Sequence, residues 1–166
     1  MKIYAIICTR VKKLNPITNV YCQTLSSFGC DVKLMVDQSS IFEAYAKGLS
    51  ECGASDEDII IFCHDDLQLL SDKRNFIAAL SRCVEKDVGI IGPAGTTHLG
   101  EDAIWWLQSR WGQVLHRGMV KHLGRSKNVI NVTEYGRHGQ VVALDGLFLA
   151  AQKKVWDQVG LQKLPL

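Results

Sequence analysis

The continuous apolar run from Ile59 to Cys63 is the feature that most constrains the fold of this chain. Four of its residues are isoleucine or phenylalanine, and no polar residue alternates with them. A strand that is apolar on both faces is typical of the middle of a parallel sheet with helices packed on each side. The run ends directly in His64, Asp65 and Asp66, so the sequence must explain why a buried strand stops at a histidine and two carboxylates.

Short apolar runs alternate with longer helix-like stretches, which is typical of βαβ units on a mainly parallel α/β sheet with helices on both faces. Residues typical of helix ends separate these runs. Asn15 before Pro16 and Ser40 three residues before Glu43 are typical of helix starts, and glycines follow the expected helices. We predict strands at Ile3–Cys8, Asp31–Val36, Ile59–Cys63, 87–93 and 139–152, and helices at 15–29, 40–53, 71–84 and 153–160. Residues 95–127 show no clear period.

A chain of 166 residues fits one domain, and we expect a single domain over residues 1–166, because neither an internal repeat nor a linker divides it. Hydrophobic residues make up 47% and charged residues 22%, a globular balance that excludes a disordered chain. No apolar run reaches the roughly 18 residues of a membrane helix. The first apolar run, Ile3–Cys8, is too short for a signal peptide, so we expect a cytosolic protein. The six cysteines form no C-x-x-C pair, which favours reduced thiols over a zinc site.

The net charge of +2 gives no general attraction to nucleic acid, and we expect no nucleic-acid partner. The segment 110–137 is nevertheless basic, with one acid, Glu134, against Arg110, Arg117, Lys121, Arg125, Lys127 and Arg137. Such a segment favours anions such as phosphates, or peripheral contact with an acidic membrane surface. A solvated basic face is an equally weighted alternative.

The polar triplet after the run at Ile59–Cys63 is a candidate metal site. In open α/β sheets, ligands bind beyond the carboxyl ends of the strands. If the strand geometry continued, His64 and Asp66 would point to one side and Asp65 to the other. Adjacent carboxylates repel, and a divalent cation that carries a nucleotide diphosphate would relieve this; Mg²⁺ or Mn²⁺ suits such oxygen ligands. Alternatively, either aspartate simply caps a turn.

The order of several short motifs along the chain resembles the inverting family 2 glycosyltransferases of the GT-A fold. These motifs are the ending Cys8-Thr9-Arg10, the pair Ser39-Ser40, and the stretches "DIIIFCHDD", "DVGIIGPAG" and "VVALDGLFLAAQKKVWDQVG". The resemblance covers nearly the whole chain, although each motif is short. It implies an α/β GT-A fold, a nucleotide-sugar such as a UDP- or GDP-sugar as donor, and Mn²⁺ or Mg²⁺ as the metal.

The resemblance also implies roles for single residues. Asp66 occupies the metal-binding position of the family's D-x-D motif, His64 the position that contacts the nucleoside, and Asp65 the variable middle position. Thr9 and Arg10 match the place where the nucleotide base packs, and Ser40, Phe42 and Tyr45 match the helix beside the donor pocket. Asp145 and Gly146 match the region that contacts the sugar and the acceptor. The alternatives are a strand end at Thr9, a surface role for Arg10, core roles for Phe42 and Tyr45, and a bulge at Gly146.

In the family, a carboxylate near the end of this region is the general base that deprotonates the acceptor hydroxyl. In this sequence no acid follows Asp157, so Asp145 is our candidate for the base. A chain that lacks the family's later helices would expose apolar surface, and we therefore expect self-association. Trp105, Trp106 and Trp111 form either a sugar-stacking wall or core and interface anchors.

The sequence thus predicts a glycosyltransferase-like protein that moves a sugar from a nucleotide donor to a hydroxyl group of a glycan or lipid-linked acceptor. A non-catalytic GT-A-like binding or assembly module without a general base is the alternative. Another kind of nucleotide-binding protein is disfavoured, because the chain has no G-x-G-x-x-G and "GPAGTTHLG" lacks the Lys-Ser/Thr ending of a P-loop.

Overall fold

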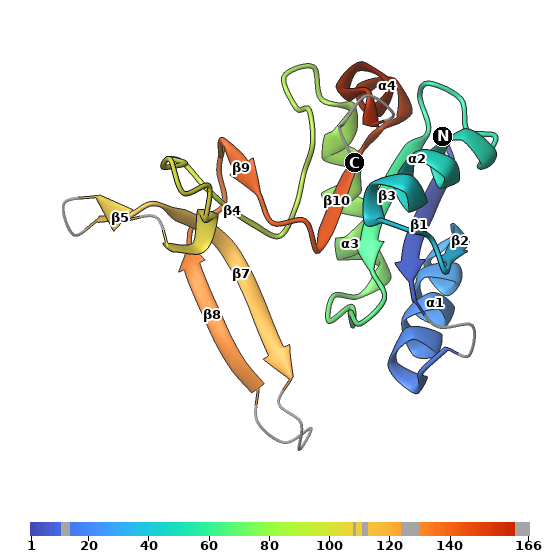
Figure 1. Ribbon diagram of the computed structural model, residues 1–166, viewed down its shortest axis with the longest axis horizontal. Helices are drawn as coiled ribbons and strands as arrows, with labels where there is room; N and C mark the ends of the chain where they lie inside the picture. Colours follow the sequence, from blue (N-terminus) through green and yellow to red (C-terminus); the bar gives the residue numbers. More distant parts are fainter. Residues whose placement is uncertain (11–13, 108, 111–112, 124–129, 162–166) are drawn as a thin grey trace. The chain divides into compact units, whose positions relative to one another are not determined.

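The computed structural model describes residues 1–10, 14–107, 109–110, 113–123 and 130–161 (Figure 1). The chain folds into two compact units, one formed by residues 1–91 with the segment from Leu147 onward, the other by residues 92–146. Each unit has its own main sheet. The expected single domain over residues 1–166 remains a prediction.

The first unit contains a four-stranded sheet with the order β10-β3-β1-β2. Its strands are β1 (Ile3–Thr9), β2 (Cys30–Val36), β3 (Ile59–His64) and β10 (Phe148–Gln152). β1 runs parallel to both β2 and β3, whereas β10 is antiparallel to β3. The mainly parallel α/β sheet that the sequence predicts is therefore confirmed, and the run Ile59–Cys63 is buried in it.

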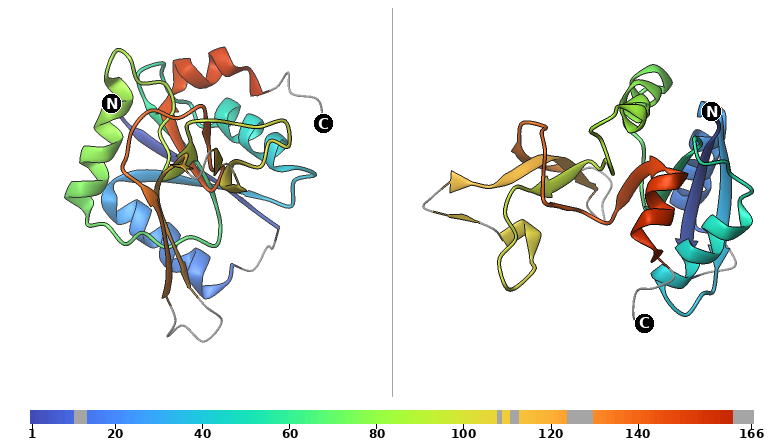
Figure 2. Two further views of the ribbon diagram at one scale, coloured as in Figure 1. Left: turned by 90° about the vertical axis from the view of Figure 1, so that its left-hand side faces the viewer. Right: turned by 90° about the horizontal axis from the view of Figure 1, so that it is seen from above.

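Helices cover both faces of this sheet (Figure 2). They are α1 (Pro16–Phe28), α2 (Ile41–Glu51), α3 (Lys73–Ser81) with the 3-10 turn η1 (Arg82–Val84), and α4 (Lys153–Val159). Alternate residues of β1 face opposite layers: Ala5 packs with α1 and α3, whereas Ile6 packs with α2 and α4. Because both faces of the strand are covered, its residues are apolar without alternation.

Local sequence signals determine where the helices of this unit begin and end. The side chain of Asn15 accepts a 2.9 Å hydrogen bond from the amide of Thr18, with Pro16 at the first helical position and Gly29 in the left-handed conformation after α1. Ser40 caps α2 through a 3.1 Å hydrogen bond from the amide of Glu43. At α3 the cap is Asp72, one residue after the predicted start at residue 71.

The second unit is a β-structure whose long hairpin of β7 and β8 stands out in Figure 1. Its main sheet has the order β8-β7-β4-β9, and β5 and β6 pair separately. Its elements are β4 (Ala94–Thr96), the 3-10 turn η2 (Trp105–Leu107), β5 (Ser109–Arg110), β6 (Gln113–Val114), β7 (His116–Leu123), β8 (Ile130–Gly136) and β9 (Ala143–Leu144).

Two of the predicted strands differ from the structure. Residues 87–93 form no continuous strand; only Ile91 pairs, through two hydrogen bonds of 2.8 and 2.9 Å with Ala150. The predicted strand over residues 139–152 is two strands, β9 and β10, which belong to different sheets. Asp145 and Gly146 lie in the connection between these strands, so they do not interrupt a single strand.

Candidate functional site

The carboxyl ends of β1, β2 and β3 meet at one edge of the first sheet. Cys8 is in register with His64, and Thr9 with Val36. The chain leaves β1 toward β2 on one side and leaves β3 toward Ile91, which pairs with β10, on the other. Neighbouring strands whose connections diverge in this way open the part of an α/β sheet where ligands bind.

The backbone of the polar triplet is held from two sides. The amide of His64 donates a 3.0 Å hydrogen bond to the carbonyl oxygen of Leu147, just before β10. The hydroxyl of Thr18, which is fully buried in α1, donates a 2.7 Å hydrogen bond to the carbonyl oxygen of Asp65. These contacts use main-chain atoms of the triplet. Asp66 is exposed, whereas His64 and Asp65 are half-buried.

The expected placement of His64 and Asp66 on one face of the sheet and Asp65 on the other depends on strand geometry that the structure does not continue. β3 ends at His64, and Asp65 and Asp66 lie in a bend, so strand geometry does not assign them to opposite faces. Instead, the carboxylate of Asp65 influences groups packed on both faces of the sheet. Its charge raises the pKa of Cys22 on α1 and of Tyr45 on α2, in each case adding to a larger effect of burial.

Charges of both signs surround the end of β1. Burial is the main cause that raises the pKa of the Cys8 thiol; the negative charge of Asp65 raises it further, and the positive charge of Arg10 lowers it. Asp65 and Arg10 therefore act on the same thiol. Arg10 is exposed, whereas Thr9 is buried at the end of the strand. A guanidinium and a carboxylate that act on the same group favour a ligand that carries both a cation and phosphates.

The residues expected beside α2 divide into three kinds. Ser40 is engaged as the helix cap, and Ser39 donates from its amide and its hydroxyl to the carboxylate of Glu43. Tyr45 is a core residue, only 7% exposed, and its ring stacks on Phe62 with centroids 4.5 Å apart. Phe42, in contrast, is 45% exposed and not in the core.

Asp37 is a residue of this edge that the sequence analysis did not select. It follows β2 with a φ of 58°, in the left-handed region that is uncommon outside glycine. Its amide donates a 3.1 Å hydrogen bond to the carbonyl oxygen of Thr9, and so it ties the ends of β1 and β2 together. The available signal was a polar run, Asp37–Ser40, directly after a strand.

Asp145 and Gly146 belong to the second unit, between β9 and β10. The amide of Asp145 donates a 2.9 Å hydrogen bond to the carbonyl oxygen of Ala94, and the residue is half-buried. Gly146 is exposed, and a Cβ added there would meet no atom within 4 Å. The β-bulge considered for Gly146 is not what the structure shows, since the residue lies in a turn.

The tryptophans of the second unit have different environments. Trp105 is buried and packs edge-to-face with Trp106, His116 and Tyr135, at centroid distances of 5.2 to 5.9 Å. Trp105 is thus a core residue, whereas Trp106 is 56% exposed. Trp111, Arg125 and Lys127 lie outside the described residues, as does the side chain of Arg110.

The carboxylates of Asp65 and Asp66 could hold a metal ion that is also bound by the phosphates of a ligand. Within the described ranges, no three His, Cys, Asp or Glu side chains are grouped so that they could hold a metal by themselves. Mg²⁺ and similar cations are commonly held by one or two carboxylates together with substrate phosphates and water, rather than by a protein cage. Asp66, with Asp65 beside it, meets that requirement.

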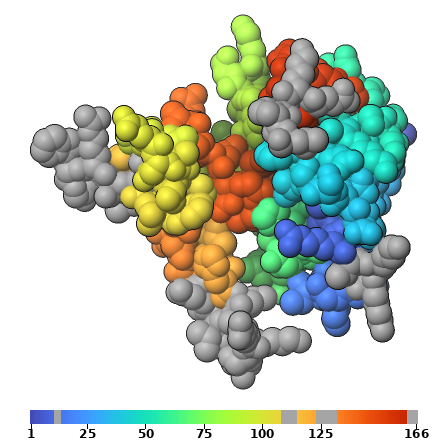
Figure 3. Space-filling view, viewed as in Figure 1, coloured from blue at the N-terminus to red at the C-terminus, as the bar shows by residue number. Residues whose placement is uncertain are grey.

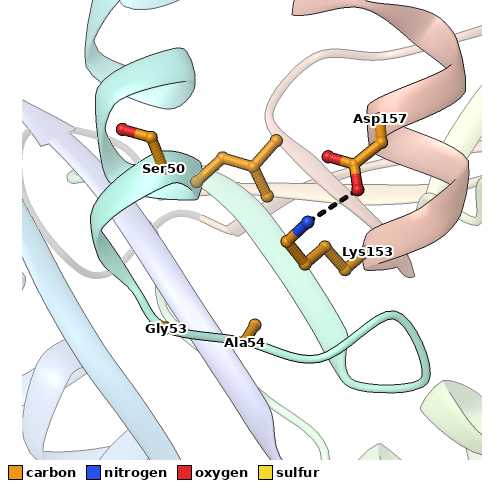
Figure 4. A pocket seen from close by; sticks show the side chains of 6 residues that line it. Ser50, Gly53, Ala54, Lys153 and Asp157 are labelled. Atoms are coloured by element: carbon orange, nitrogen blue, oxygen red, sulfur yellow. Dashed lines mark hydrogen bonds and ion pairs between the residues drawn. The ribbon is translucent and has the colours of Figure 1, made fainter.

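A separate pocket of about 160 Å³ opens at the opposite end of this unit, where α2 ends and α4 begins (Figure 4). It is lined by Leu49, Ser50, Gly53, Ala54, Lys153 and Asp157. In Figure 3 the red surface of α4 adjoins the teal surface of the segment after α2. The pocket contains none of the predicted site residues, and it is smaller than the roughly 300 Å³ at which small-molecule sites begin.

Sequence comparison identifies the family of this chain. The model of the glycosyltransferase-like family matches residues 11–159, which is most of the sequence. The chain belongs to the glycosyltransferase-like family. A comparison with curated proteins found no match. Among the described residues, no helix of this glycosyltransferase-like protein has the length and apolar character needed to cross a membrane.

The family assignment confirms the resemblance that the motifs indicated, and the α/β sheet with helices on both faces agrees with it. The matched region of this glycosyltransferase-like chain includes the triplet His64-Asp65-Asp66 and the pair Asp145-Gly146. The roles of these residues, the metal and the donor remain predictions.

Proposed function

We propose that this member of the glycosyltransferase-like family binds a UDP- or GDP-sugar with Mn²⁺ or Mg²⁺ at the carboxyl edge of β1 and β3, and transfers the sugar to a hydroxyl group. The hydroxyl belongs to a glycan or a lipid-linked acceptor. The observation that carries the proposal is the exposed carboxylate of Asp66 at the end of the central strand, within the region that the family matches.

Three features of this edge support donor binding: an anchored main chain, the positive charge of Arg10, and the carboxylates of Asp65 and Asp66. The main chain of the triplet is anchored by Thr18 and Leu147, so the carboxylate of Asp66 need not take part in the fold. Arg10 brings a positive charge that suits phosphates. When bound, a divalent cation would offset the negative charge of the departing diphosphate. Asp66 would hold it, and Asp65 would add its charge nearby.

In the proposed transfer, the bond between the anomeric carbon and the diphosphate oxygen breaks while the acceptor oxygen bonds to that carbon. The proton of the acceptor hydroxyl must pass to a base, and we assign this to the carboxylate of Asp145. Asp145 precedes Leu147 by two residues, and Leu147 is the residue hydrogen-bonded to His64. This position along the chain supports the assignment.

Calorimetric titration of UDP and of GDP, each with and without Mn²⁺, tests donor binding. We expect metal-dependent binding of one nucleotide and a loss of at least tenfold in affinity in Asp66→Asn. The matched control is Asp87→Asn, the same change at an exposed aspartate in the turn after η1, which should leave affinity unchanged. Failure of both nucleotides to bind the folded wild-type chain would refute the donor site.

Release of free nucleotide from a panel of UDP- and GDP-sugars, with a glycan acceptor present, tests transfer. We expect Asp145→Asn to bind the nucleotide normally and to lose turnover by about 10²-fold or more, as expected for a general base. Metal-dependent binding without turnover in the wild-type chain would instead favour the non-catalytic binding module.

A further inference from the structure

The second unit contains a small pocket of about 60 Å³ that the proposed donor site does not use. It lies beside the pairing of β4 with β7, where Gly95 is opposite Arg117, and it is closed by the segment that follows β8. Four of its ten lining residues are glycines, so much of its wall is main chain.

Two of these glycines are required by the packing around the pocket. A Cβ at Gly118 would collide with the carbonyl oxygen of Pro93, and Gly118 also has a φ of +90°, which side chains disfavour. A Cβ at Gly95 would collide with the carbonyl oxygen of Ala143. Side chains at these positions would displace the main chain that forms the wall, so the pocket depends on both glycines.

The ionisable groups that line this pocket are Arg117 and His138, and no carboxylate lies among its lining residues. Arg117 is half-buried and its main chain pairs with Gly95, but among the described residues its guanidinium has no hydrogen-bond or ion-pair partner. Its Nε lies 3.8 Å from where a Cβ of Gly139 would be, so the guanidinium lies along the segment after β8. A half-buried cation without a protein partner favours an anion at the same place.

We propose that this pocket binds the oxyanion group of a sugar substrate, a phosphate or a carboxylate, through Arg117 and His138. The planar guanidinium presents paired N–H donors that match two oxygens of such a group. The pocket volume of about 60 Å³ is far below the roughly 300 Å³ at which small-molecule sites begin, so it admits one small anionic group and not a nucleotide. Its lining residues all belong to the second unit and include none of those assigned to the donor, and that the ligand is a sugar rests on the proposed function.

The experiment is a titration of the ¹⁵N-labelled full chain with inorganic phosphate at constant ionic strength, followed through its amide signals. We expect saturable shifts of the amides of Gly95, Gly118 and Gly139. Arg117→Gln should weaken phosphate binding by roughly tenfold or more, as expected for loss of a charge-assisted hydrogen bond. The control Arg137→Gln removes the same charge from an exposed residue outside the pocket, and should change affinity less than twofold.

His138→Gln provides a second test on an exposed residue, where folding is not at risk, and should weaken binding several-fold. Parallel titrations with glucose 1-phosphate and glucuronate distinguish a phosphate-bearing from a carboxylate-bearing sugar. The proposal is overturned if no glycine amide shifts, or if Arg137→Gln weakens binding as much as Arg117→Gln. It is also overturned if Asp66→Asn abolishes the shifts, since the anion would then be held at the donor site.

Discussion

The amide of His64 donates a 3.0 Å hydrogen bond to the carbonyl oxygen of Leu147, and so links the last residue of β3 to the start of β10. This contact uses the main chain of the histidine. The imidazole ring is therefore not needed for this strand contact, and it is half-buried at the edge where we propose that the nucleotide binds. A substitution at His64 can test the ring without removing the link between the strands.

His64→Ala should retain the fold and weaken nucleotide binding. Because the main-chain hydrogen bond survives, we expect the melting temperature to change by no more than a few degrees. Loss of one ring hydrogen bond to the nucleoside should lower affinity by about five- to tenfold, measured by calorimetry. His122→Ala, at an exposed histidine of β7, is the control. Unchanged affinity in His64→Ala would contradict nucleoside contact by this ring.

Thr18→Val should loosen the polar triplet. The substitution removes the hydroxyl that donates 2.7 Å to the carbonyl oxygen of Asp65 and keeps the shape of the side chain. We expect a loss of about 1–3 kcal/mol in the free energy of unfolding by urea, because the part-buried carbonyl of Asp65 loses its partner. Thr24→Val on the same helix removes a hydroxyl bonded to the carbonyl of Val20, at an exposed site, and should cost far less. Equal losses in the two variants would show that the contact with Asp65 has no special role.

Gly146→Ala should leave stability almost unchanged. An added Cβ meets no atom within 4 Å, and the residue does not require the left-handed conformation. Any decrease in turnover would therefore report on a bound sugar or acceptor near this position. The contrasting variant is Gly48→Ala, whose Cβ would collide with the side chain of Ile6 and which should lower the urea midpoint. A destabilised Gly146→Ala would contradict the open environment of Gly146.

Stability should fall above pH 9 because of buried thiols. Burial raises the pKa of Cys63 from its ordinary value of 9.0 to about 12, and the pKa values of Cys30 and Cys83 to about 11. Below pH 9 these thiols are protonated in both the folded and the unfolded states, so their contribution to the free energy of unfolding is fully present. Between pH 9 and pH 11 to 12, the unfolded chain loses protons that the folded chain keeps. Each thiol then lowers the free energy of unfolding by up to about 1.4 kcal/mol per pH unit.

Urea unfolding at pH 8, 9, 10 and 11 measures this slope. Cys63→Ala should flatten it while lowering stability at pH 8, because the substitution leaves a small cavity. Thr24→Val, which removes no thiol, is the control and should leave the slope unchanged. A slope that is the same in Cys63→Ala and the wild-type chain would contradict the role of this thiol.

Much of the first unit follows from local patterns in the sequence. The caps Asn15 and Ser40 and the left-handed glycines Gly29 and Gly53 bound α1 and α2 close to where the sequence predicts. These signals are readable because each acts within a few residues of the chain. The apolar run Ile59–Cys63 likewise predicts a strand buried on both faces. The polar triplet after it indicates the edge of the sheet at the carboxyl ends of the strands.

The strands of the second unit are harder to predict from the sequence. β7 and β8 expose the apolar Val132 as well as the polar Lys121, His122 and Glu134, so apolar and polar residues do not divide cleanly between a buried and an exposed face. Their pairing also depends on partners far along the chain. The same reason explains why one apolar stretch, 139–152, divides between two sheets at Asp145.

The sequence by itself determined the α/β class, the buried central strand, the acidic edge and the resemblance to glycosyltransferases, because these depend on residue order and local hydrophobic pattern. Only the tertiary structure decided that β10 runs antiparallel beside β3, that Thr18 holds Asp65, and that Arg117 lines a glycine-walled pocket. Those relationships join residues far apart in the chain. Their free energy comes from pairing and burial in the folded state, which no short stretch of sequence encodes alone.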